Sequence, residues 1–200
     1  MTDEQLAIIR SFLEDFEKLA DIASEMSWAK TDTKHIELRI PYSSFITDPS
    51  IDITTIRFEK GFVSEHFAES VSQVMIAAAT LNEGCDADKE WQDDELRRDM
   101  LKNYWGIAVW DSLEYKEISL TEESIDEMTR YICENTAYDS QLKKQRDYEL
   151  PPDAQAMLSF FHDVKLYNIG EEPHIGYGGG NWIALKDDTF LWVRYSGITD

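Results

Sequence analysis

Two apolar segments near the end of the chain constrain the fold most: NWIALK at 181–186 and TFLWVRY at 189–195. Both are apolar at nearly consecutive positions, which is typical of strands that are buried on both faces. Only Asp187 and Asp188 separate them, and a connection of two residues favours a β-hairpin. The sequence therefore predicts a hairpin in the interior of a sheet.

Two further strands are predicted earlier in the chain. The segment HIELRI, residues 35–40, alternates apolar and polar side chains, as a half-buried strand does, and Pro41 ends it. The segment 51–62 is rich in β-branched residues and closes at Gly61. Together with the hairpin, these segments predict a mainly antiparallel sheet.

Helices are predicted where apolar residues recur at three- and four-residue spacing. The first runs from Thr2 to Met26 and begins with a capping box between Thr2 and Gln5. Another covers residues 67–81 and is followed by Gly84, which suits a C-terminal cap. Both have an apolar stripe that needs a surface to pack against.

The second half of the chain predicts further helices. Ser119 and Glu122 have the spacing of a capping box ahead of an apolar series at 125–132, and Pro151 and Pro152 suit the start of a helix. The fold class is therefore α+β: several amphipathic helices packed on a mainly antiparallel sheet that includes a C-terminal β-hairpin.

The length predicts one globular domain, residues 1–200, because a chain of 200 residues can bury one sizeable core. A weak boundary near residues 139–150 is the alternative, since QLKKQRDYEL is locally basic and suits a linker or a surface turn.

The glycine run in HIGYGGGNW, residues 174–182, raises the question of a nucleotide site. A dinucleotide-binding loop needs a third glycine and a helix directly after it. Here Asn181 stands in place of that glycine, and the next residues are typical of a strand. We expect the run to form a turn or bulge that leads into the hairpin.

No metal, cofactor or catalytic residue is predicted. Asp86, Asp88 and Glu90 have the spacing of the first calcium ligands of an EF-hand, but Trp91 and Arg97 replace its turn glycine and bidentate glutamate. The histidines, which are His35, His66, His162 and His174, show no metal-ligand spacing.

The cellular compartment is predicted from the cysteines and from the search for membrane-spanning or secretory segments. Cys85 and Cys133 are far apart and each lies near acidic residues, which raises a thiol pKa and predicts structural or incidental roles. No apolar stretch is long enough to cross a membrane, and the start of the chain carries acids rather than the basic residues of a secretory signal. We expect a cytoplasmic protein.

Charge is the strongest functional signal. Forty acidic residues against nineteen basic ones give a formal net charge of -21. Such a charge repels nucleic acid and anionic membranes and accelerates encounter with a basic protein. The alternative is that the charge serves solubility alone.

Two acidic stretches, near residues 86–95 and 111–123, are predicted to bind the partner. Trp91 lies within the first stretch, where an aromatic side chain with a charged rim suits an interaction hot spot; packing of Trp91 in the core is the alternative. The predicted partner-binding residues are Asp86, Asp88, Glu90, Trp91, Asp93, Asp94, Glu95, Asp111, Glu114, Glu117, Glu122 and Glu123.

Three functional hypotheses follow. The leading one is a non-enzymatic acidic inhibitor of a basic protein, of the immunity or anti-defence type, with nucleic-acid mimicry as one form. The second is an enzyme or ligand-binding protein with a site around His162, His174 and Gly176–Gly180. The third is a regulatory module that binds a partner through its N-terminal helix. The sequence does not specify an oligomeric state.

Overall fold

A computed structural model describes residues 1–14, 30–38, 46–81, 120–139, 144–145, 147–170 and 177–199. Its elements, in chain order, are α1 (Asp3–Glu14), β1 (Lys30–Glu37), β2 (Ile46–Arg57), α3 (Phe62–Glu65), α4 (Phe67–Leu81), β3 (Thr121–Glu123), α9 (Ile125–Thr136), β4 (Tyr138–Asp139), β5 (Lys144–Gln145), α10 (Pro152–Ser159), β6 (Leu166–Gly170), β7 (Tyr177–Lys186) and β8 (Thr189–Thr199).

A six-stranded sheet in the order β1-β2-β8-β7-β6-β3 forms the centre of the fold, and every neighbouring pair is antiparallel. The predicted C-terminal hairpin is confirmed: β7 pairs with β8 up to Lys186 and Thr189, across the turn at Asp187–Asp188. Consecutive residues of both strands are buried, as a two-sided interior position requires.

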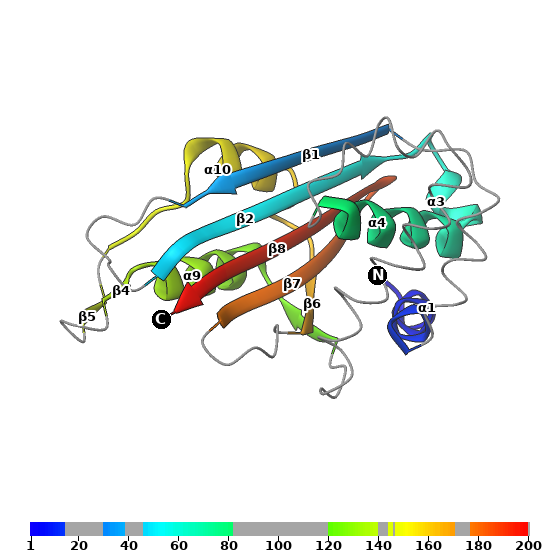
Figure 1. Cartoon of the computed structure of the whole chain (residues 1–200). Helices are drawn as coiled ribbons and strands as arrows, with labels where there is room; N and C mark the ends of the chain where they lie inside the picture. The colour runs from blue at the N-terminus through cyan, green and yellow to red at the C-terminus, as the bar shows by residue number, and fades with distance from the viewer. Residues whose placement is uncertain are drawn as a thin grey trace.

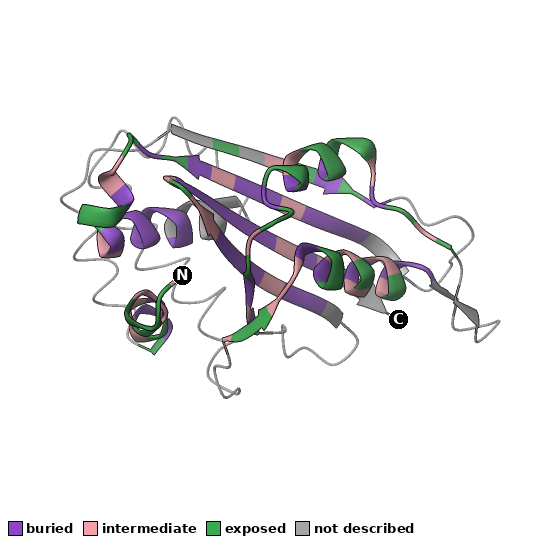
Figure 2. Ribbon diagram, turned by 180° about the vertical axis from the view of Figure 1, so that it is seen from behind, coloured by how far each residue is buried: buried purple, intermediate pink, exposed green. Residues whose placement is uncertain are grey.

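Helices cover both faces of this sheet, so the predicted α+β class is confirmed (Figure 1). One apolar cluster joins α1, α3 and α4 to side chains such as Phe190 and Ile183. The other joins α9 and α10, which lie on the opposite face in Figure 2, to Leu191 and Trp182. Alternation along each strand sends neighbouring residues to opposite faces, and this is why the hairpin needs apolar residues at consecutive positions.

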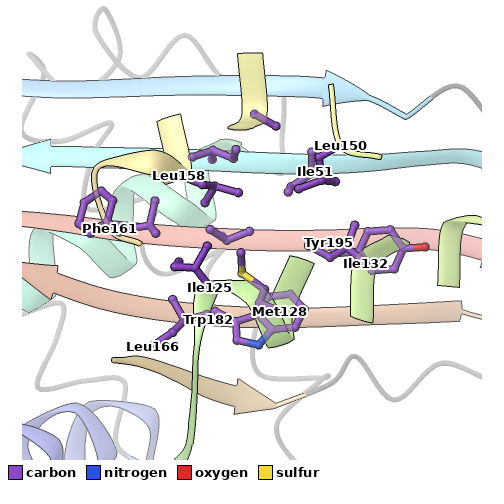
Figure 3. Close-up of a cluster of buried hydrophobic side chains, with 14 of the residues drawn as sticks. Ile51, Ile125, Met128, Ile132, Leu150, Leu158, Phe161, Leu166, Trp182 and Tyr195 are labelled. Carbon is purple, nitrogen blue, oxygen red and sulfur yellow. The ribbon is translucent and has the colours of Figure 1, made fainter. Parts of the chain in front are cut away.

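The cluster beneath α9 and α10 shows how the helical stripes meet the sheet (Figure 3). Ile125, Met128 and Ile132 lie three and four residues apart on α9 and are at most 6% exposed. They pack in the same cluster as Trp182 of β7 and Tyr195 of β8. The predicted apolar series of this helix is therefore confirmed.

The start of α9 differs from the sequence prediction. Its N-cap is Ser124, whose hydroxyl accepts a hydrogen bond from the backbone of Glu127, while the Glu127 carboxylate accepts one from the backbone of Ser124. The predicted cap was Ser119 with Glu122, but Glu122 lies in β3 and pairs with β6. Two successive capping patterns exist in the sequence, at 119–122 and 124–127, and strand pairing selects the second.

The glycine run also differs from the prediction. Gly178, Gly179 and Gly180 are part of β7 and pair with β8, so these residues form a strand instead of a turn or bulge. A Cβ on Gly180 would lie 2.8 Å from Cζ2 of Trp182 and would also clash with Cη2. Because Gly180 has no side chain, the indole of Trp182 can lie over the strand at that position.

The other predicted elements are confirmed with shifted ends. Thr2 and Gln5 form the expected capping box ahead of α1, with Thr2 N to Gln5 Oε1 at 2.9 Å and Gln5 N to Thr2 Oγ1 at 3.2 Å. β1 covers 30–37 rather than 35–40, and β2 covers 46–57 rather than 51–62. The cap predicted at Gly84 and the continuation of the first helix to Met26 lie outside the described residues.

Candidate partner-binding surface

Most predicted partner-binding residues lie outside the described part of the chain. These are Asp86, Asp88, Glu90, Trp91, Asp93, Asp94, Glu95, Asp111, Glu114 and Glu117. The structure places the remaining two, Glu122 and Glu123, side by side on the edge strand β3. Their side chains have different surroundings: the Glu123 carboxylate binds groups inside the fold, whereas the Glu122 carboxylate lies at the surface.

The Glu123 carboxylate is engaged with the interior of the fold. Its Oε2 accepts a hydrogen bond from the indole Nε1 of Trp182 at 2.9 Å, and its Oε1 accepts one from Nδ2 of Asn168 at 3.1 Å. Trp182 is 1% exposed, so Glu123 is the partner of a buried donor. This residue therefore anchors β3 to β6 and β7.

Glu122, in contrast, is exposed. Its carboxylate lies 2.8 Å from Nζ of Lys165, and the hydrogen bond from that ammonium raises the pKa of Lys165. Both side chains are more than half exposed, so water screens this pair and it adds little to stability. Glu122 remains available to a partner.

The outer side of α9 adds carboxylates that the sequence analysis did not select. Ile125, Met128 and Ile132 turn one side of the helix toward the sheet, so the residues in the opposite helical phase face solvent. Exposed there are Asp126, Glu127 and Glu134, with Arg130 as the base among them. We call Glu122, Asp126, Glu127, Glu134 and the exposed Glu149 the α9 acidic surface. Helical phase around the apolar series was the signal that could have identified it.

A local contact favours the charged form of one member of this surface, Glu127. Hydrogen bonds from Ser124 lower the pKa of Glu127, the backbone bond contributing most, because they favour the ionised carboxylate. At the other end of α9, burial raises the pKa of the Cys133 thiol, and the charges of Glu149 and Glu134 raise it further. Both carboxylates therefore act on the same thiol, and its raised pKa disfavours the reactive thiolate.

The alternative site around His162, His174 and Gly176–Gly180 is only partly described. His162 is exposed, and its neighbour Asp163 forms an ion pair with Lys186 at the end of β7. The glycines lie at the other end of that strand, and the six residue steps from Gly180 to Lys186 span about 20 Å. The structure does not bring His162 to the glycines. His174 and Gly176 lie outside the described residues.

A polar row crosses the same sheet face that α1 and α4 cover elsewhere. Nδ1 of His35 lies 2.6 Å from Oδ1 of Asp52, and the strand register places Arg194 beside Asp52 on β8. In the next row, the hydroxyls of Ser50 and Ser196 lie 3.0 Å apart. Within the described ranges, no three histidine, cysteine, aspartate or glutamate side chains converge to hold a metal ion.

An open depression of about 510 Å³ lies between α1, α3 and the hairpin turn. Its most buried acid, Asp188, is used by the fold: its carboxylate accepts hydrogen bonds from the backbone N–H groups of Gly61 and Val63. Lys60 and Asp187 also line it and are exposed. This arrangement presents neither a nucleophile with a base nor an enclosed binding pocket.

None of the helices in the described ranges is both long enough and apolar enough to span a membrane.

Comparison with known proteins adds no functional assignment. No family model matches the sequence, and no curated protein matches it. Among solved structures, the fold is weakly similar to the crystal structure of citrus MAF1, with a TM-score of 0.32, 10% sequence identity, and coverage of 92% of this chain and 99% of that one. A likeness of this strength carries no argument about fold family or function.

Proposed function

We propose that this protein binds a basic protein through acidic side chains and inhibits it by covering its substrate-binding surface. The observation that carries the proposal is the net charge of -21, together with the exposed carboxylates of the α9 acidic surface. An immunity or anti-defence inhibitor is the class of function that fits such a charge, and its setting would be the cytoplasm.

The α9 acidic surface supports this proposal because its carboxylates stand on a rigid element. The apolar stripe of α9 fixes the helix on the sheet, so Asp126, Glu127 and Glu134 keep their relative positions without a partner. Pre-organised charges lose little conformational entropy on binding. Close charge pairs in other inhibitor complexes contribute about 1.5–7 kcal/mol of coupling.

The acidic stretch 86–95 supplies the second half of the proposal. Trp91 and its neighbouring acids would form the hot spot, and the α9 acidic surface would extend the contact. If the partner is a nuclease or another enzyme of nucleic acids, the carboxylates would occupy the positions of phosphates. The protein would then compete with nucleic acid instead of binding it.

The first experiment immobilises the full-length protein, loads host extract at low salt and elutes with a salt gradient. Any basic protein recovered is then purified, and its association rate is measured as a function of salt. We expect the rate to fall steeply with ionic strength and the partner's activity on its own substrate to be inhibited. Equal affinity in low and high salt contradicts the proposal.

Charge-matched variants locate the surface. Asp126→Lys with Glu134→Lys changes the α9 acidic surface, and Glu59→Lys with Glu65→Lys makes the same change in net charge around α3, on the other side of the sheet. Replacing Asp93 and Glu95 by lysine makes the same change in net charge in the other acidic stretch. We expect the first and third variants to lose more affinity than the second. An equal loss in all three would mean that net charge alone, without a specific surface, drives capture.

A further inference from the structure

The outer edge of β1 carries backbone groups that no other strand in the described part of the chain uses. β1 is the terminal strand of the six-stranded sheet, as Figure 1 shows, and among the described residues it pairs only with β2. The backbone N–H of Leu38 donates to the carbonyl of Pro49 at 2.7 Å, directly opposite in the register. Even-numbered residues therefore bond to β2, and odd-numbered ones direct their N–H and C=O groups outward.

We propose that a second copy of this chain pairs with this edge, antiparallel, with the two-fold axis at Thr33. In that register Thr33 lies opposite Thr33 of the second copy, and Thr31 lies opposite the His35 of that copy. All of these residues point their backbone groups outward, so the contact forms about six hydrogen bonds between the copies. A two-fold axis allows the same strand of two identical chains to pair with each other.

Charge complementarity selects this register over its neighbours. With the axis at Thr33, Asp32 of each copy lies opposite Lys34 of the other, and no like charges face one another. Moving the axis by one residue in either direction places Asp32 opposite Asp32 or Lys34 opposite Lys34. Like charges directly opposite destabilise an antiparallel pair, whereas opposite charges stabilise it.

The side chains at these positions are disposed for such a contact. Asp32 is exposed, and Lys34 is half-buried and forms an ion pair with Asp153 of α10. That contact holds the ammonium group of Lys34 beside the sheet edge, where the second copy brings its Asp32. Each copy carries a charge of -21, so mutual repulsion makes the dimer weak and dependent on concentration.

The test is sedimentation of the full-length protein from low micromolar to submillimolar concentration, in about 0.15 M salt, where repulsion is screened. We expect the mass to rise from 23.2 kDa toward twice that value. Thr33→Pro removes an outward N–H without removing a bond to β2, and edge strands tolerate proline. This variant should remain monomeric throughout. A monomer at all concentrations in the original protein, or a dimer unaffected by Thr33→Pro, overturns the proposal.

Charge variants test the register independently of the proline. Asp32→Lys should weaken the dimer at least tenfold, and adding Lys34→Asp should restore it because the opposite charges then face each other again. Glu37→Lys makes the same change in net charge, but its opposite position in the second copy is residue 29, beyond β1, so it should not weaken the dimer. Equal effects of Asp32→Lys and Glu37→Lys, or no recovery in the double variant, would refute this register.

Discussion

At the scale of single residues, the fold depends on the fit between Gly180 and Trp182. Both lie on β7 two residues apart, so their side-chain positions share one face of the sheet. The indole fills the space above Gly180 and donates its N–H to Glu123 on the edge strand β3. One aromatic side chain thus explains both a glycine in a strand and an acid at the sheet edge.

Gly180→Ala should lower the free energy of unfolding by about 1–3 kcal/mol, because the new methyl group meets the indole. Urea denaturation measures this change. Combining it with Trp182→Phe removes the clash, so the double variant should lose less stability than the sum of the two single variants. Additive losses would show that the indole does not limit the space at Gly180.

Glu123→Ala should cost about 1–3 kcal/mol, because the buried indole N–H of Trp182 loses its acceptor. Glu122→Ala is the matched control, since it removes the adjacent carboxylate and breaks only an exposed ion pair, which is worth about 0–1 kcal/mol. Equal losses of stability in the two variants would contradict the different roles assigned to these neighbours.

At the scale of elements, the capping box of α9 shows how a helix start is chosen. Ser124 and Glu127 satisfy one another's backbone donors at the first turn. The competing pattern at Ser119 and Glu122 cannot form the same structure, since Thr121–Glu123 hydrogen-bonds to β6. A capping motif can therefore start a helix only where its residues are not already hydrogen-bonded in a strand.

Ser124→Ala should destabilise the protein by about 1 kcal/mol, as loss of an N-cap does elsewhere. Thr129→Ala, in the interior of the same helix, should cost little, since alanine has the higher helix propensity. Thermal or urea unfolding compares the two. No loss of stability in Ser124→Ala would show that the cap contributes nothing to stability.

The same box predicts a dependence on pH. Folding lowers the pKa of Glu127, so its contribution is fully present above the unfolded pKa and is lost as pH falls through the lower folded pKa. Stability measured from neutral pH down to about pH 3 should therefore fall less steeply in Glu127→Gln than in the original protein. Parallel curves for the two proteins would exclude this contribution.

At the scale of the whole molecule, charge repulsion opposes the compact state. We expect the repulsion produced by a net charge of -21 to outweigh the small attraction within exposed ion pairs, such as Lys165 with Glu122. Adding sodium chloride should therefore raise the free energy of unfolding, measured with urea because guanidinium is itself a salt. A decrease with salt would mean that ion pairs stabilise the fold more than repulsion weakens it.

The sequence by itself determined the apolar faces of the elements. The two-sided hairpin, the helical series at 125–132 and the capping box of α1 could all be predicted, because each depends on neighbours within a few residues. The charge that motivates the proposed function is likewise a property of composition. Neither signal says which surfaces meet.

Only the tertiary structure decided the rest. The glycine run pairs with β8 as a strand and leaves room for Trp182 at Gly180. Ser124 caps α9 because Glu122 is paired in β3. Glu123 accepts the hydrogen bond of Trp182, which lies 59 residues away in the sequence. The acids of the α9 acidic surface gain their common orientation only when the apolar stripe of that helix docks on the sheet. The physical reason is that local patterns state which side of an element avoids water, whereas packing between distant segments decides what covers it.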